Sequence, residues 1–320
     1  MSHYRHLTTE ERESAMIMRS NGLSFRAIAL ILGRHASTLT REFRRNIKPD
    51  GCYRASYATK QYNKRRKKCC KKSILSNPIA MQFVIDKMLI KWTPEQISGY
   101  SKLHAFPISF SYGTIYRAID NHILPSPLKK EMRFKNKYKT HKKNDKRGKM
   151  QDITSIHKRS ASIENRKSLG HWESDTILGQ RKTGAIATHV ERKSGYLIAA
   201  KIEKHNSELF TEVTIKSFAK IPKKYCRTFT VDRGKEFTLH KILAEKLKAR
   251  IYFCDPYAPW QRGTNENTNG LLRQFYPKKT SFAHITQDDL DLVVALINQR
   301  PRKRLGWRTP EEVFYKNYFR

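Results

Sequence analysis

Three acidic residues stand where their carboxylates could act together. Asp175 lies inside a predicted strand, Asp232 at the end of another, and Glu266 in the first turns of a predicted helix. Mg²⁺ prefers carboxylate oxygens and leaves positions open for water and phosphate. Two such ions, roughly 3.5–4 Å apart, can activate a water or a 3′-hydroxyl and stabilise a leaving oxygen. Taken alone, each acid is more simply a surface carboxylate or, for Glu266, a charge that favours the helix dipole.

Other residues near these acids could also take part. Glu173 shares strand parity with Asp175, so it is an alternative metal ligand, although a supporting role fits it better. Three aromatic residues could stack on unpaired bases, although packing explains each at least as well: Trp172, Tyr257 and Trp260.

The elements that must position the acids alternate in type. Strands are predicted over 172–178, 185–190, 196–202, 227–231 and 251–254, and helices over 207–219, 236–248, 263–275 and 288–300. Three strands followed by alternating helices and strands predict a mixed α/β domain. Since active sites of open sheets gather at strand ends, Asp232 is well placed for chemistry.

The N-terminal region has the pattern of a helix-turn-helix. Thr8 or Thr9 can cap a first helix, Ser24 a second, and a third would start near Ser37 after a turn at Gly33. The second helix would bury Ile28, Ile31 and Leu32, and the third Leu39 and Phe43. Because the third helix would enter the major groove, its basic and polar residues are the candidate DNA contacts: Arg34, Ser37, Thr38, Arg41, Arg44 and Arg45. A plain three-helix core with a basic surface is the alternative.

The rest of the chain suggests further divisions. Helices are predicted after Thr93 and after Ser111, and they could form a second helix-turn-helix despite the long connection through Pro107. We therefore expect a helix-turn-helix domain over 1–50, a basic helical region over 51–128, a basic linker over 129–168 and a catalytic domain over 169–320. Two runs, 60–72 and 129–149, are so basic that they are expected to contact DNA phosphates or to remain solvated.

Composition narrows the classes of function. The chain has 320 residues and a formal net charge of +37, which points to a nucleic-acid partner. There is no apolar run long enough to cross a membrane, no signal for attachment to one, and no apolar N-terminal leader, so no membrane partner is expected. The five cysteines form no disulfide framework or zinc pair, which fits a reducing cytoplasm.

Several stretches of sequence together resemble a known family. Gly170-His171-Trp172-Glu173-Ser174-Asp175, Asp232-Arg233-Gly234-Lys235-Glu236-Phe237, the segment from Pro256 to Asn267, and Leu271-Leu272-Arg273 look like bacterial DDE transposases of the insertion-sequence-thirty (IS-thirty) family. The 33 residues between Asp232 and Glu266 (266 − 232 − 1) match the family's spacing. The resemblance spans most of the chain and includes the N-terminal segment from Leu32 to Thr38.

The resemblance implies a fold and a reaction. The core would be RNase H-like, as in retroviral integrases, and Asp175, Asp232 and Glu266 would be catalytic and hold two Mg²⁺ ions, with Mn²⁺ as a substitute. The enzyme would cleave 3′ ends at terminal inverted repeats, which the helix-turn-helix would recognise, and would transfer them to target DNA. It would act as a homo-oligomer in a synaptic complex, without a small-molecule substrate.

Two basic residues refine this expectation. Arg273 lies seven positions after Glu266, on the same helix face, where a guanidinium could grip phosphate. The family usually has Asn after the second Asp, and here it is Arg233, which could weaken metal binding or contact substrate phosphate. A DNA-binding regulator with an inactive core therefore stays open as an alternative, and a general nuclease is disfavoured because it needs no sequence reader.

Overall fold

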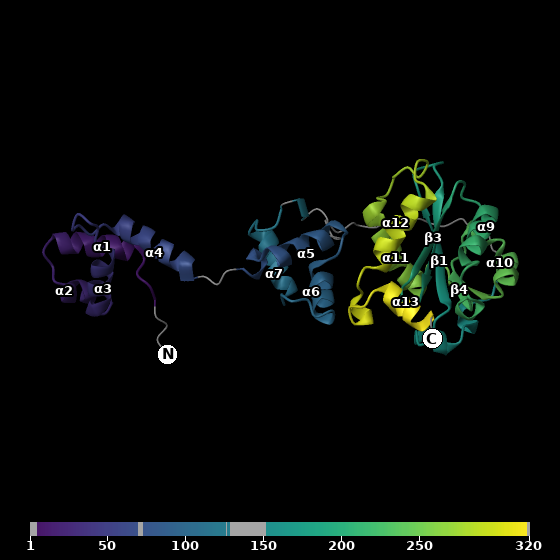
Figure 1. The fold of residues 1–320 in the computed structure, drawn as a ribbon, viewed down its shortest axis with the longest axis horizontal. Coiled ribbons are helices and arrows are strands. Elements are labelled where there is room, and N and C mark those ends of the chain that lie inside the picture. Colours follow the sequence, from purple (N-terminus) through teal and green to yellow (C-terminus); the bar gives the residue numbers. More distant parts are fainter. Residues whose placement is uncertain (1–4, 70–72, 126, 129–151, 319–320) are drawn as a thin grey trace. The chain divides into compact units, whose positions relative to one another are not determined.

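The computed structural model describes residues 5–69, 73–125, 127–128 and 152–318. The chain divides into two compact units, residues 1–73 and 74–320. Figure 1 shows that the first is helical and that the second contains the sheet.

The first unit begins with the predicted helix-turn-helix. Its helices are α1 (Thr9–Ser20), α2 (Phe25–Ile31) and α3 (Ala36–Asn46). Thr8 and Glu11 form a reciprocal capping box at the start of α1, and Ser24 caps α2. Gly33 has φ +59°, so it makes the left-handed turn between α2 and α3 that favours glycine.

The small core of this unit corrects one predicted residue. Ile28, Leu39 and Phe43 are buried as predicted, and Leu32 is partly buried. Ile31 was predicted to face inward but is 61% exposed. The prediction for Ile31 was wrong because α2 ends at Ile31, and its seven residues turn only one side toward α1 and α3.

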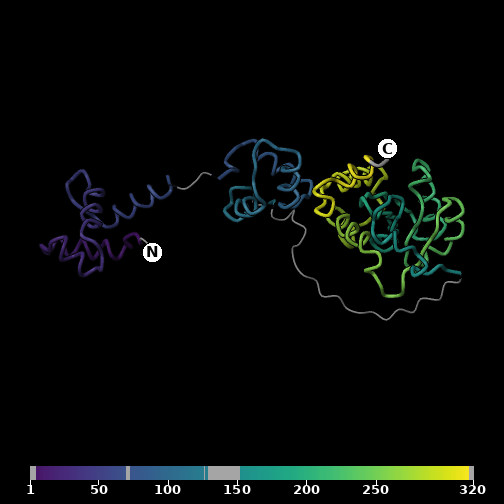
Figure 2. Tube along the Cα trace, turned by 90° about the horizontal axis from the view of Figure 1, so that it is seen from below, coloured from purple at the N-terminus to yellow at the C-terminus, as the bar shows by residue number. Residues whose placement is uncertain are grey.

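The first basic run is largely helical. Residues 60–69 lie on α4 (Ala55–Cys69), which packs against α1 and α3. Ala55 and Ala58 are buried there, and Arg65 donates to the Asn46 side chain at 2.7 Å. The helix is thus anchored from Ala55 to Arg65, and Figure 2 shows its last turns extending beyond the other helices of this unit. This unit therefore continues past the predicted boundary at residue 50.

The second unit starts with a helical subregion built around its own core. It contains α5 (Pro78–Leu89), α6 (Pro94–Leu103) and α7 (Tyr112–Asp120). Thr93 and Gln96 form the predicted capping box of α6, and Ser111 caps α7. The buried residues of this subregion include Val84, Ile97 and Ile115.

Helix α6 also contacts the C-terminal segment of the chain. The Gln96 amide donates to the Pro301 carbonyl at 2.8 Å and accepts from Arg300 Nε at 2.8 Å. Gly99 lies against Trp307 so closely that an added Cβ would be 2.1 Å from the ring. These contacts join the helical subregion to the α/β part of the same unit.

The α/β part is organised around a five-stranded sheet. The strands are β1 (His171–Leu178), β2 (Ala185–Glu191), β3 (Leu197–Ile202), β4 (Thr228–Val231) and β5 (Arg250–Phe253). Their order is β3-β2-β1-β4-β5. The β3–β2 and β2–β1 pairs are antiparallel, and the β1–β4 and β4–β5 pairs are parallel. The mixed sheet confirms the predicted α/β class.

Helices cover both faces of this sheet. Figure 1 shows α9 (Ser207–Phe218) and α10 (His240–Leu247) on one side, and α11 (Gly263–Phe275) and α12 (Gln287–Asn298) on the other. A last helix, α13 (Pro310–Tyr318), was not predicted. The predicted helix over 236–248 is divided into a short 3-10 turn, η5 (Lys235–Phe237), and α10.

Part of the predicted linker over 129–168 belongs to the folded sheet domain. Residues 129–151 lie outside the described residues, but 152–168 pack on the sheet. The Phe253 N–H donates to the Thr154 carbonyl at 2.8 Å, and Ser155 forms a parallel bridge with Phe253. A turn, η3 (Ile156–Lys158), and a short helix, α8 (Ala161–Glu164), follow.

No helix within the described ranges is long and apolar enough to span a membrane.

Candidate active site and DNA interface

Strand β1 places Asp175 on the sheet face that α11 covers. The carboxylate accepts from the Thr176 N–H at 2.9 Å and from Asn269 Nδ2, on α11, at 3.0 Å. Burial raises the pKa of the Asp175 carboxyl, and the nearby Arg262 guanidinium opposes this rise. The side chain remains 27% exposed, so ligands can reach it.

Asp232 follows β4 directly and lies beside Asp175. Its Oδ1 accepts from the Gly234 N–H at 2.8 Å. The Arg262 guanidinium bridges the two acids: Nη2 is 2.9 Å from Asp232 Oδ2, and Nη1 is 3.2 Å from Asp175 Oδ1. Nη1 also donates to the Ser174 carbonyl at 2.9 Å. Two of the three predicted acids therefore meet around one cation.

Glu266 is the third predicted acid, and it is exposed on α11. It precedes Asn269 by three residues, so the two side chains neighbour each other on the helix surface. Because Asn269 already contacts Asp175, Glu266 lies on the face of α11 that borders this acid. Within the described part of the chain, no group of three or more His, Cys, Asp or Glu side chains is arranged so that it could hold a metal ion.

The chemistry of this donor set fits a hard divalent cation. Asp175 and Asp232 turn carboxylate oxygens toward a common point, and a guanidinium cation occupies that point. Oxygen ligands of this kind are those that Mg²⁺ and Mn²⁺ select. Glu266 could supply a further carboxylate, because its side chain is exposed on α11.

Glu173 has a different role from that of its neighbour Asp175. It is fully buried, and its Oε1 accepts a hydrogen bond from Arg192 Nη1 at 2.6 Å. Its Oε2 accepts from the Asn265 N–H at 2.9 Å, in the first turn of α11. The carboxylate thus caps α11 from β1, and its charge favours the positive end of the helix dipole. This geometry supports the positioning role over that of a metal ligand.

The two basic residues near the acids are already engaged with backbone. Arg273 Nη2 donates to the Leu178 carbonyl at 2.8 Å, at the end of β1. Arg233 Nε donates to the Cys254 carbonyl at 3.3 Å, on the side of Asp232 that faces β5. Both tie loops around the acids together, and a phosphate contact would have to compete with these bonds.

The aromatic candidates fall into two groups. Trp172 is completely buried, and its Nε1 donates to the Tyr225 carbonyl at 2.8 Å. Trp172 is therefore a core residue and cannot stack on a base. In contrast, Tyr257 and Trp260, in the loop that leads to α11, are 69% and 74% exposed.

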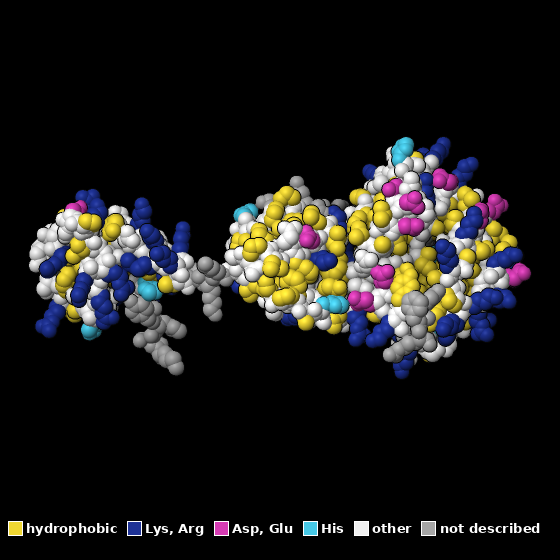
Figure 3. Space-filling view, in the orientation of Figure 1, with side chains coloured by type: hydrophobic (Ala, Val, Ile, Leu, Met, Phe, Trp, Pro, Cys, Tyr) yellow, Lys and Arg dark blue, Asp and Glu magenta, His cyan; other side chains and the backbone are white. Residues whose placement is uncertain are grey.

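The candidate DNA contacts on the first unit also differ among themselves. Arg34 forms an ion pair with Glu11, 2.8 Å between Nη2 and Oε1, so it fastens the turn before α3 to α1. Ser37 contacts the ring of His35, which caps α3, and Thr38 is partly buried. The exposed arginines available to DNA are Arg41, Arg44 and Arg45. Figure 3 shows Lys and Arg side chains spread over the visible face of this unit.

Three residues of the site are not among those that the sequence predicts. Arg262 bridges the acids, Asn269 contacts Asp175, and Glu236 accepts from Thr176 Oγ1 at 2.9 Å beside them. All three lie within or next to the stretches that carry the resemblance. The helical spacing of Asn269 from Glu266 could have revealed it, but nothing local indicates where the Arg262 guanidinium points.

The fold and the site define an integrase-like core joined to a helix-turn-helix domain. Residues 3–46 match the helix-turn-helix domain family, and residues 165–259 match the integrase core domain family. The chain is 38% identical over 320 residues to transposase InsI for insertion sequence element IS30A of Escherichia coli, covering 96% of this chain and 83% of that protein. It is 35% identical to the transposase for insertion sequence element IS1086 of Cupriavidus metallidurans, covering 97% and 94%.

A further relative has the same extent of similarity. The transposase for insertion sequence element IS4351 of Bacteroides fragilis is 35% identical over 315 residues, covering 97% of this chain and 95% of that protein. The chain belongs to the IS30 family of insertion-sequence transposases. The integrase match ends at residue 259, so Glu266 lies beyond it.

Proposed function

We propose that the protein cleaves 3′ DNA ends at the terminal inverted repeats of its own element and joins them to target DNA in the bacterial cytoplasm. The observation that carries the proposal is the meeting of Asp175 and Asp232 around one cationic group beside α11. Membership of a transposase family supports the same reaction class. Glu266 is the third catalytic carboxylate of the proposal.

The three acids would hold two Mg²⁺ ions, with Mn²⁺ as a substitute. When bound, such ions activate an oxygen nucleophile and stabilise the leaving oxygen of an in-line displacement. In this proposal Asp175 and Asp232 bind from the sheet, and Glu266 closes the site from α11. Because Arg262 now pairs with both Asp175 and Asp232, its guanidinium would have to release them for metal to bind, and it could then turn toward a DNA phosphate.

The first unit would select the DNA. Arg41, Arg44 and Arg45 lie on α3, the second helix of the helix-turn-helix pair, which is the one that reads the major groove in such domains. Binding two ends at once calls for more than one copy of the chain, and so we propose a homo-oligomer in the complex that cuts and joins DNA.

One experiment tests the reaction directly. Purified protein is mixed with duplexes carrying the ends that flank its gene, with Mg²⁺ or Mn²⁺, beside Asp175→Asn and Glu266→Gln variants. We expect metal-dependent cleavage at the ends by the unaltered protein, and binding without cleavage by both variants. Binding without cleavage by all three proteins would overturn the proposal in favour of a DNA-binding regulator. Normal cleavage by Glu266→Gln would refute the site assignment.

A further inference from the structure

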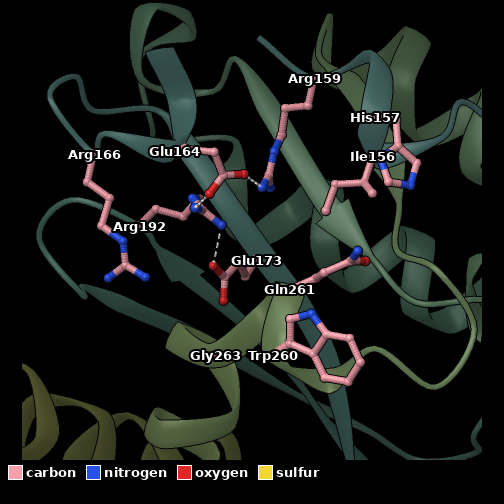
Figure 4. A pocket seen from close by; sticks show the side chains of 10 residues that line it. All are labelled: Ile156, His157, Arg159, Glu164, Arg166, Glu173, Arg192, Trp260, Gln261 and Gly263. Atoms are coloured by element: carbon pink, nitrogen blue, oxygen red, sulfur yellow. Dashed lines mark hydrogen bonds and ion pairs between the residues drawn. The ribbon is translucent and has the colours of Figure 1, made fainter. Parts of the chain in front are cut away.

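A pocket of about 350 Å³ lies beside the candidate active site. Figure 4 shows it between the segment 156–166 and the turn that leads into α11. Glu173 lines it and lies two residues before Asp175 on β1, about 7 Å along the strand. Gly263, which follows Arg262, lines it from the other side. Whatever occupies the pocket is therefore a close neighbour of the phosphodiester at the acids.

The floor of the pocket is polar but balanced in charge. Arg159 and Arg192 are buried, and both pair with Glu164, Arg192 at 2.9 Å. Arg192 also pairs with Glu173, so two guanidiniums face two carboxylates. Their Nε atoms are buried and have no hydrogen-bond partner among the described residues. Because this floor is neutral overall, it suits a neutral polar group better than a second phosphate.

The rim of the pocket carries an aromatic ring and a cation. Trp260 exposes 74% of its surface, and an exposed indole is a typical surface for a stacked base. The Arg166 backbone N–H donates to the Ile163 carbonyl at 3.3 Å, but its guanidinium makes no hydrogen bond or ion pair within the described segments. In Figure 4 the Arg166 guanidinium and the Trp260 indole lie on opposite sides of the pocket. A neutral floor, an aromatic wall and a cationic rim together match a nucleoside whose phosphate stays at the mouth.

The size of the pocket and its surroundings agree with this ligand. A volume of 350 Å³ is at the small end of ligand pockets and admits one nucleotide, not a duplex. Arg166 and Gly263 also line an adjoining pocket of about 180 Å³ with Arg304 and Thr264. The Thr264 hydroxyl in that second pocket is buried and has no hydrogen-bond partner in the described chain. If a nucleotide occupies the larger pocket, the DNA strand that continues from it would therefore have this second polar pocket beside it.

We propose that this pocket receives one unpaired nucleotide of the DNA end, adjacent to the scissile phosphate. The base leaves the helical stack and lies on the Trp260 indole, and Arg166 contacts its phosphate. Taking a nucleotide out of a duplex requires unstacking and unpairing, which a fitted pocket and a stacking ring offset. This inference rests on the proposed function, since it assigns a part of the DNA substrate to the same site.

Binding measurements without cleavage test the pocket. Two duplexes with the element's end sequence are compared in Mg²⁺-free buffer: one is fully paired, and the other has a single unpaired nucleotide next to the cleavage position. We expect the unaltered protein to bind the unpaired end about tenfold more tightly, the scale of one base–aromatic stack. Trp260→Ala should remove this preference and Trp260→Phe should restore most of it. Arg166→Gln should weaken binding of both duplexes and lower its salt dependence by about one phosphate contact.

Tyr257→Ala is the matched control, because Tyr257 is an exposed aromatic of the same loop but does not line the pocket. It should keep the preference for the unpaired end. Equal binding of both duplexes by the unaltered protein, or the same loss in Tyr257→Ala as in Trp260→Ala, would overturn the inference. Cleavage of the same ends with Mg²⁺ is scored separately. Failure to cleave, with the preference intact, would refute the proposed reaction and leave the pocket standing.

Discussion

Replacing Glu173 by Gln tests whether this residue positions α11 or binds metal. The substitution keeps the shape of the side chain but removes its charge. Glu173 is fully buried and its partner Arg192 is 5% exposed, so solvent screens the pair very little. Breaking a buried ion pair from one side costs about 3–5 kcal/mol, and the lower end is expected here, because buried Arg192 keeps its contact with the exposed Glu164 carboxylate at 2.9 Å. The first turn of α11 also loses its anionic cap.

Thermal unfolding measures the size of this effect. For a domain of this size, each kcal/mol lowers the melting temperature by roughly 2–4 °C. We therefore expect Glu173→Gln to melt at least about 6 °C below the unaltered protein, without added metal. Changing Arg192 to Met in the same chain should recover part of the loss, because the double variant no longer buries the Arg192 charge without Glu173. A melting temperature within about 2 °C of the unaltered protein, together with loss of stabilisation by Mn²⁺, would refute our reasoning and make Glu173 a metal ligand.

The contacts and burial of single residues predict the effects of four other changes. Arg262→Gln should lower the melting temperature without metal but increase the stabilisation that Mn²⁺ provides, because Arg262 and a metal ion share two carboxylates; an unchanged response to Mn²⁺ in a thermal melt would contradict this competition. Arg41→Ala should abolish end-specific binding in a gel-shift assay without changing stability, since the side chain is exposed on α3. Burial lowers the pKa of His171 to about 4 and that of His189 to about 3. Below pH 6.5 the unfolded chain therefore binds more protons than the folded protein. The free energy of unfolding, measured by urea titration, should fall from pH 6.5 toward pH 4 by up to about 1.4 kcal/mol per pH unit for each histidine. Gly99→Ala should destabilise the second unit by about 1–3 kcal/mol in the same assay, because the new methyl group would overlap the ring packed against it.

Local patterns in the sequence predicted most of the elements. The bounds of α11 agree with the prediction over 263–275, and the five strands agree within one residue at each end. Alternation along strands, helix caps and Gly turns are all encoded by neighbouring residues, and so they are readable without a structure. The short helix α8 was missed because its four residues carry no periodicity, and its place is set by packing on the sheet.

The sequence by itself determined the spacing of the three acids, the helix-turn-helix and the family, because these depend on residue types at fixed intervals. Only the tertiary structure decided what the charged side chains near them do. It paired Arg34 with Glu11, buried Glu173 beneath α11 and placed Arg262 between Asp175 and Asp232. The physical reason is that a long charged side chain can reach several partners, and its partner is chosen by which distant strands and helices are brought together when the chain folds.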